Sequence, residues 1–229
     1  MKKNSILFLS LLILISFTGC GKKNTSEDFK KIDYDLKELE YIKICDDEST
    51  CPVTATTYFG NMSYSTDVKE LKDALNTINE DTKKYREKTL NSEVEDEVCK
   101  ENIKYKYFVN SNYYQYTNDD FVTFGVVRNG YYVCDDKNDP IPTTSYIYDI
   151  KEGKMLSQEE FKEKIKLSDA KIKEAIDSSI NIMNEYDNKK YKIRESYKDV
   201  ILLYDSNGNL YASYLLKDIN KYMIAKIEM

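Results

Sequence analysis

FVTFGVVRNGYYVC, residues 121–134, and IKYKYFV, residues 103–109, form the most strand-like region of the chain. Ile103, Tyr105, Tyr107 and Val109 alternate with Lys104 and Lys106, which is the period of a strand with one buried face. A type I′ turn requires positive φ at both central residues, so Asn129-Gly130 after an apolar run predicts a two-residue hairpin turn. A second turn is expected at Asn110-Ser111-Asn112. These segments predict an antiparallel sheet.

On either side of this region, other β-branched and aromatic segments predict more strands, and the turn residues between them predict loops. A loop is expected over residues 135–142, and a hairpin turn over residues 205–209, which contain Asn-Gly-Asn. The further strands are predicted at residues 39–44, 53–59, 145–150, 200–204, 210–216 and 222–227. The first two are expected to pair with each other.

Helical spacing appears in three places. Residues 66–88 carry apolar side chains three or four apart, with Thr66 or Asp67 as the expected N-cap. Ser157-Gln158-Glu159-Glu160 is a capping box and predicts a short helix after it. Residues 169–186 predict a longer one. Because helices and strands are grouped rather than strictly alternating, the expected fold class is α+β, an antiparallel sheet with one long helix and a C-terminal helical pair packed on it.

The N-terminus predicts export. Two lysines precede a twelve-residue apolar run, residues 6–17, which is too short to span a bilayer. Phe17-Thr18-Gly19-Cys20 resembles a bacterial lipobox, which implies that residues 1–19 are a lipoprotein signal peptide and that Cys20 carries lipid. The alternative is an ordinary secretory signal that is cut elsewhere.

Cleavage before Cys20 would leave 210 of the 229 residues, with 32 basic and 40 acidic side chains and a net charge of −8. We expect residues 20–35 to be a flexible linker and residues 36–229 to form a single domain. An acidic chain is a poor partner for nucleic acid or an anionic membrane surface. The expected location is therefore extracytoplasmic, held to the cell membrane through the lipid alone.

Four cysteines follow Cys20, and an even number in an exported chain favours two disulfides. Four cysteines allow three pairings, of which Cys45–Cys51 with Cys99–Cys134 is favoured because the first pair closes a short polar loop. Free buried thiols are the alternative. No metal or cofactor is expected, since no Cys-x2-Cys pair occurs and the chain has no histidine.

The absence of histidine also removes Ser/His and Cys/His catalysis and the commonest general base. Ser168-Asp169-Ala170-Lys171 fits a Ser-x-x-Lys pattern, but Ser168 stands where a helix cap belongs. Residues 205–209 begin like a calcium loop, yet Leu occupies the sixth and twelfth places, so a turn is favoured. The acidic clusters at residues 46–48, 119–120 and 135–136 fall in predicted loops, where solvated charge is the ordinary explanation. We therefore expect no enzymatic activity.

Tyrosine is the positive compositional signal, with 21 residues concentrated over the predicted sheet. An alternating strand places some of these rings on its outer face, where amphipathic rings suit recognition of a protein or glycan. Coding bias and β-propensity explain the composition equally well. The candidate ligand-binding residues are Tyr113, Tyr114, Tyr116, Tyr131 and Tyr132.

Residues 146–157, YIYDIKEGKMLS, followed by a short helix, resemble the Tyr-x-x-Asp-Leu-x-Thr-Gly-Lys-x-Leu segment of one extracytoplasmic domain family. That family includes lysozyme-sensing anti-sigma factor ectodomains of the RsiV type and the N-terminal domain of PdaC-type peptidoglycan deacetylases. Its Gly-Gly-Ala-His stretch is missing here, where residues 133–144 stand instead. The resemblance implies lysozyme or peptidoglycan as ligand.

Together these observations predict a bacterial surface lipoprotein with a non-enzymatic domain that binds or senses an envelope protein or glycan. Two alternatives remain open. A cell-wall hydrolase would place two converging carboxylates in a deep cleft, and a small-solute receptor would show a large apolar pocket between two lobes.

Overall fold

The computed structural model describes residues 40–45, 56–62, 66–95, 103–193, 196–197 and 199–229. Over these residues the protein has nine strands in three antiparallel sheets and three helices. In chain order they are β1 (Glu40–Lys43), β2 (Thr56–Phe59), α1 (Lys69–Leu90), β3 (Tyr107–Thr117), β4 (Phe121–Tyr132), β5 (Lys137–Asp149), β6 (Lys154–Leu156), α2 (Gln158–Lys164), α3 (Asp169–Asp187), β7 (Ile201–Tyr204), β8 (Leu210–Leu216) and β9 (Lys221–Ile227).

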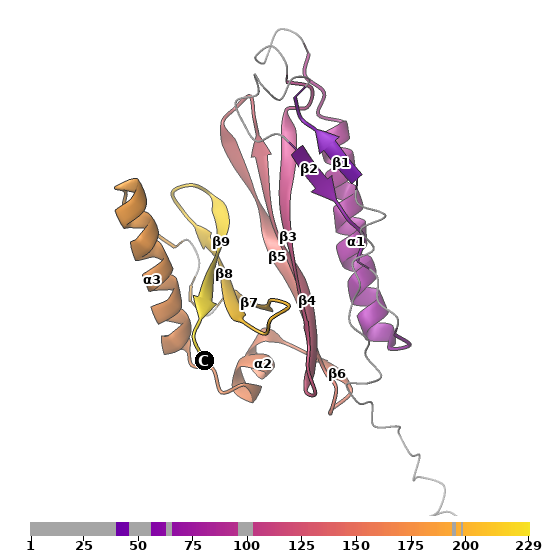
Figure 1. Ribbon diagram of the computed structural model, residues 1–229, viewed down its shortest axis with the longest axis vertical. Helices are drawn as coiled ribbons and strands as arrows, with labels where there is room; N and C mark the ends of the chain where they lie inside the picture. The colour runs from indigo at the N-terminus through magenta and orange to yellow at the C-terminus, as the bar shows by residue number, and fades with distance from the viewer. Residues whose placement is uncertain (1–39, 46–55, 63–65, 96–102, 194–195, 198) are drawn as a thin grey trace, which may run out of the picture.

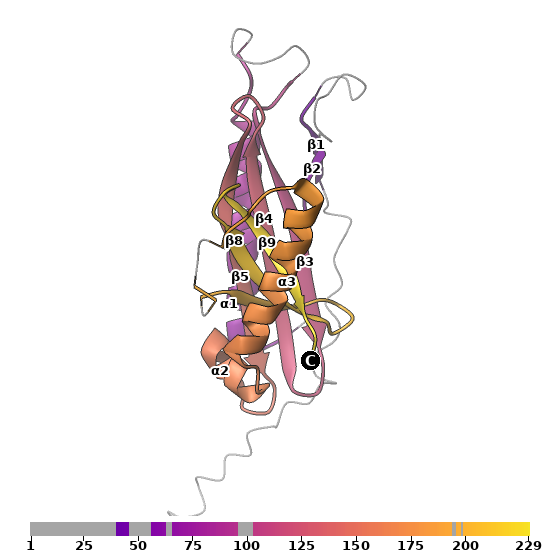
Figure 2. The ribbon, with the colours of Figure 1, turned by 90° about the vertical axis from the view of Figure 1, so that its left-hand side faces the viewer.

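The elements stack in four layers, which Figure 1 shows edge-on. The long sheet β3-β4-β5-β6 has α1 and the β1-β2 ribbon on one side and the small sheet β7-β8-β9 on the other. Helix α3 covers the outer face of the small sheet, and Figure 2 shows it in front of β8 and β9. Helix α2 lies at the end of the stack near β6. Both faces of the long sheet are therefore covered.

The apolar run in β4 follows from this position. All residues from Phe121 to Arg128 are buried, because one set of alternate side chains faces α1 and the other faces the small sheet. Val122, Phe124 and Val126 pack against Leu71, Leu75 and Ile78 of α1. Phe121 instead joins the core formed with α2, α3 and the small sheet.

Most helix predictions are confirmed. Helix α2 begins with a full capping box from Ser157 and Glu160. The Ser168 side chain accepts a hydrogen bond from Lys171 N, so the Ser-x-x-Lys pattern is the N-cap of α3. The predicted cap of α1 is wrong, because its N-cap is Val68 and makes no side-chain cap bond.

Two strand predictions are confirmed. Strand β1 pairs with β2, and a hairpin turn joins β7 to β8.

The predicted fold class is wrong. The described residues are mostly β, and their strands form three sheets rather than one sheet with helices packed on it. No C-terminal helical pair exists, because α3 lies on the small sheet while α2 lies near β6. The last three strands bury their apolar faces between α3 and the long sheet. Periodicity predicts that a strand has a buried face, but it does not say which sheet the strand joins.

Two turn predictions are wrong as well. Asn129 and Gly130 lie within β4, paired with Asn110 and Val109 of β3, so neither Asn-Gly nor residues 110–112 form a turn. A Cβ on Gly130 would lie 2.9 Å from Tyr107 Cζ, so the absence of a side chain leaves room for this ring. Asn129 exchanges two hydrogen bonds with the backbone of Tyr222, which ties β4 to β9. The predicted loop 135–142 is mostly strand, because β5 begins at Lys137.

Candidate functional site

The five candidate tyrosines lie on both faces of the long sheet. Tyr113 packs with the α1 cluster and donates a hydrogen bond to Gly60 O (3.2 Å), and the ring of Tyr132 lies 4.7 Å from that of Tyr107 on the same side. Tyr114, Tyr116 and Tyr131 are on the opposite face. The structure therefore does not bring the five rings together on one surface.

Each of these tyrosines is half-buried and has a partner in the fold. The ring centroids of Tyr114 and Tyr211 are 6.1 Å apart, and those of Tyr116 and Tyr204 are 5.1 Å apart, so both pairs join the two stacked sheets. The hydroxyl of Tyr131 donates to Asp136. A role in ligand binding stays a prediction for these residues, and their positions give them packing roles.

Residues 146–157, which carry the family resemblance, have structural roles in the fold. Asp149 is buried and forms an ion pair with Lys164 of α2, and its side chain accepts a hydrogen bond from Glu152 N at 2.8 Å. Gly153 adopts a φ of 66°, which a glycine tolerates without strain. Ser157 begins the capping box. These residues build the connection from β5 to α2.

Of the cysteines, Cys20, Cys51 and Cys99 lie outside the described residues. Cys45 and Cys134 are both disulfide-bonded, and Cys45 is buried. The favoured pairing stays a prediction.

The acidic clusters that the structure describes have ordinary partners. Asp120 pairs with Lys151, and Asp136 accepts from Tyr131. Asp205 accepts hydrogen bonds from the backbone of Asn207 and Asn209 and holds the turn between β7 and β8. Residues 46–48 lie outside the described residues. Within the described part of the chain, no three Cys, Asp or Glu side chains are grouped so as to hold a metal ion.

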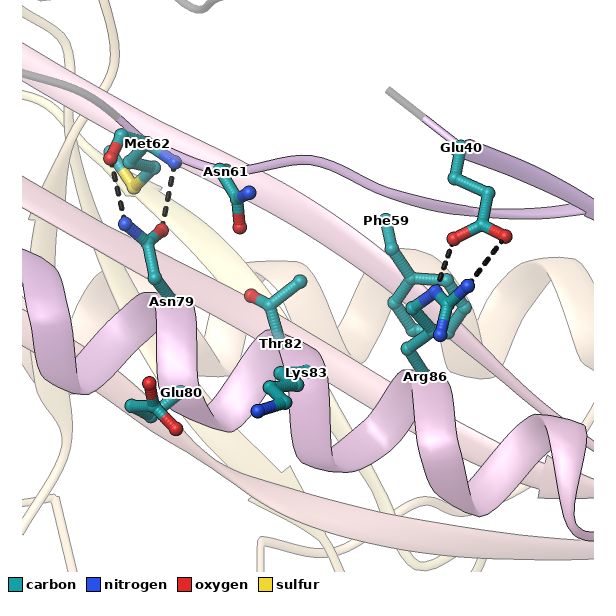
Figure 3. A pocket seen from close by; sticks show the side chains of 9 residues that line it. All are labelled: Glu40, Phe59, Asn61, Met62, Asn79, Glu80, Thr82, Lys83 and Arg86. Atoms are coloured by element: carbon teal, nitrogen blue, oxygen red, sulfur yellow. Dashed lines mark hydrogen bonds and ion pairs between the residues drawn. The ribbon is translucent and has the colours of Figure 1, made fainter. Parts of the chain in front are cut away.

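A polar groove lies between α1 and the segment that leaves β2, and Figure 3 shows it from close by. Its volume is about 560 Å³. We call it the α1–β2 groove, formed by Glu40, Phe59, Asn61, Met62, Asn79, Glu80, Thr82, Lys83 and Arg86. Phe59, Met62 and Thr82 are buried and form its floor, whereas Asn61, Glu80 and Lys83 are exposed.

Two polar contacts hold the walls of the groove together (Figure 3). At one end, Asn79 Nδ2 donates to Met62 O and Asn79 Oδ1 accepts from Met62 N, both at 2.8 Å. At the other end, Arg86 donates two hydrogen bonds to the Glu40 carboxylate, and this contact lowers the pKa of Glu40 below its usual value. These two contacts mark the two ends of the groove.

A buried arginine supports the floor from below. Arg128 of β4 is 1% exposed, and its Nη2 donates to Ile78 O at 3.2 Å and to Thr82 Oγ1 at 2.7 Å. Burial lowers the pKa of this guanidinium below its ordinary value. These bonds fix the rotamer of Thr82 and join α1 to the long sheet.

None of the sequence-based predictions includes this groove, although α1 carries a signal for it. Asn79 follows Leu75 by four residues and Thr82 follows Ile78 by four, so polar side chains continue the apolar stripe of the helix. Polar residues on a buried stripe need specific partners, which here are Met62 and Arg128. The other wall comes from β1 and β2, whose position no local pattern predicts.

No protein-family model matches the sequence, and a search of curated proteins found no significant match. None of the helices in the described part of the chain is both long and apolar enough to cross a membrane.

Proposed function

We propose that this chain is a lipid-anchored surface protein of the bacterial envelope, and that its domain binds an envelope protein or glycan without catalysis. The α1–β2 groove is the observation that supports binding. It combines a buried floor of Phe59, Met62 and Thr82 with exposed groups that donate and accept hydrogen bonds, which is the arrangement of a preformed ligand site. The resemblance of residues 146–157 makes lysozyme and peptidoglycan the first ligands to test.

The charges in the groove favour binding over hydrolysis. A general acid works near neutral pH only if its pKa is raised, whereas the hydrogen bonds from Arg86 lower the pKa of Glu40. The chain also has no histidine to act as a base. The ion pair with Arg86 keeps Glu40 ionised, which suits a structural contact at the end of the groove rather than proton donation.

The anchor is tested at Cys20. We expect cells fed a palmitate analogue to label the protein and retain it in the membrane fraction, because the lipobox thiol receives a diacylglycerol. Cys20→Ala should abolish the label and release the protein from the membrane. Label that survives in Cys20→Ala would contradict the anchor.

The groove is tested by filling it. Asn61→Trp places an indole at the exposed rim, and we expect it to weaken binding of lysozyme or peptidoglycan at least about tenfold, which is about 1.4 kcal/mol. Asn76→Trp is the matched control, since Asn76 is an exposed residue of α1 that does not line the groove. Binding is measured by co-sedimentation with purified peptidoglycan and by titration with lysozyme.

Thermal melting of both variants checks that neither one unfolds. If Asn61→Trp and Asn76→Trp weaken ligand binding equally, the ligand does not bind in the α1–β2 groove. A wild-type protein that binds neither ligand would contradict the proposed function.

A further inference from the structure

We propose that the α1–β2 groove binds a peptide segment that carries both an ammonium group and a carboxylate, and not a sugar chain. This inference rests on the proposed function and names the ligand class of the same site. It follows from the charges on the rim, from the buried position of Phe59 in the lining, and from the backbone groups of Gly60 and Met62 that already form hydrogen bonds.

The rim presents opposite charges side by side. Glu80 and Lys83 are three residues apart on α1, so they project from the same side of the helix, and both are exposed. Over the described residues neither one takes part in an ion pair, whereas Arg86 and Glu40 pair with each other at the end of the groove. Glu80 is thus placed for a ligand ammonium, and Lys83 for a ligand carboxylate.

A neutral sugar suits this rim poorly. It would cover Glu80 and Lys83 without supplying an opposite charge, and removing water from an uncompensated charge is costly. The C–H face of a sugar ring binds best to the exposed face of an aromatic ring, because that face is electron-rich. Among the described residues that line the groove, Phe59 is the one aromatic residue, and it is 4% exposed and lies in the floor.

The strand-side wall offers little backbone for recognition. The N–H and C=O of Met62 are bonded to Asn79, and Gly60 O accepts from Tyr113. A ligand therefore cannot extend the β1-β2 ribbon at Met62 by pairing with its main chain. Recognition at this wall therefore relies mainly on side chains. The charged lining residues that form no ion pair over the described residues are Glu80 and Lys83.

The test uses the full lipidated chain in detergent and three probes from one peptidoglycan preparation. The probes are the stem peptides that an amidase releases, the same peptides after N-acetylation, and the glycan strands that remain. Isothermal titration should show binding of the stem peptides, at least tenfold weaker binding of the acetylated peptides, and none of the glycan strands. Raising the salt concentration should weaken the binding.

Charge reversal locates the ligand in the groove. Glu80→Lys and Lys83→Glu should each weaken stem-peptide binding at least tenfold, because each replaces an attraction by a repulsion. The double variant Glu80→Lys/Lys83→Glu should recover part of the loss, since a peptide with both charges can bind in the opposite direction. Glu70→Lys and Lys72→Glu are matched controls on exposed positions of α1 outside the groove, and they should bind as the wild type does.

Failure of this inference can be told from failure of the proposed function. If glycan strands bind and the charge reversals change nothing, while Asn61→Trp still abolishes capture of peptidoglycan, the ligand is a sugar chain and the peptide inference is overturned. Binding of lysozyme alone, unaffected by charge reversal, would overturn it too. In both cases the binding function stands.

Discussion

Gly125→Ala is expected to lower the free energy of unfolding by about 3 kcal/mol, because the two stacked sheets leave no space for one methyl group. A Cβ on Gly125 would lie 2.5 Å from Thr144 O and 2.6 Å from Leu203 Cδ2. Thr144 O is backbone of the neighbouring strand β5, and it cannot move without disturbing the pairing of β4 with β5. Leu203 belongs to β7, so the same methyl group would also push the small sheet away.

The measurement is thermal and urea unfolding of the wild type and the variant. For a chain of this size about 3 kcal/mol corresponds to a fall of roughly 6 to 12 °C in Tm. The double variant Gly125→Ala/Leu203→Ala should lose less than the sum of the two single losses, because removing Leu203 Cδ2 relieves one of the two collisions. A Gly125→Ala protein that melts at the wild-type temperature would show that the sheets do not approach as closely as described.

Asp149→Ala is the second substitution with a large expected effect, a loss of about 3 kcal/mol. The carboxylate is 1% exposed, pairs with Lys164 and accepts a hydrogen bond from Glu152 N. Alanine would leave Glu152 N without its hydrogen-bond acceptor. It would also remove the ion pair that joins the end of β5 to Lys164 of α2. Asp149→Asn keeps the shape and one acceptor oxygen but not the charge, so we expect a smaller loss.

The contribution of Asp149 depends on pH. Burial raises the pKa of this carboxyl, but the hydrogen bonds from Lys164, Glu152 N and Lys151 N outweigh burial, and the net pKa in the folded state is lowered. A lowered pKa means that the stabilisation is fully present above the unfolded pKa of about 3.9 and is lost as the pH falls through the folded value.

The pH dependence is checked by urea unfolding of the wild type, Asp149→Asn and Asp149→Ala. We expect the difference between wild type and Asp149→Asn to be constant from about pH 7 to pH 5 and to shrink below about pH 4. A difference that stays constant into that acid range, or a wild type that gains stability there relative to Asp149→Asn, would contradict the ion pair with Lys164.

Asn-Gly occurs twice in the chain, and tertiary contacts determine whether it forms a turn. In residues 205–209 the pattern forms the predicted turn, because Asp205 accepts bonds from the backbone of Asn207 and Asn209 and stabilises it locally. In β4 the same dipeptide is strand. There Gly130 makes room for the ring of Tyr107, and the side chain of Asn129 bonds to Tyr222. Both partners of this Asn-Gly pair lie far away in the chain.

The candidate tyrosines show that a local pattern also fails to predict a binding surface. Alternation along β3 predicts that Tyr113 and Tyr114 face opposite sides, but it does not say whether either side meets solvent. The structure places α1 on one side and the small sheet on the other, so both rings are half-buried. The groove instead uses residues from β1, from the segment after β2 and from α1, which are separate in the sequence.

The sequence alone determined the features that depend on contacts within about four residues. These are the capping box at Ser157, the N-cap at Ser168, the extent of α3 and the turn at Asp205, where each side chain bonds to a backbone group of its own segment. Long-range packing is instead the reason that the strands form three sheets, that Asn129-Gly130 is not a turn, and that α1 and the chain after β2 enclose a groove. These outcomes depend on long-range pairing, in which many segments have a suitable apolar face and packing of the whole chain selects the partners.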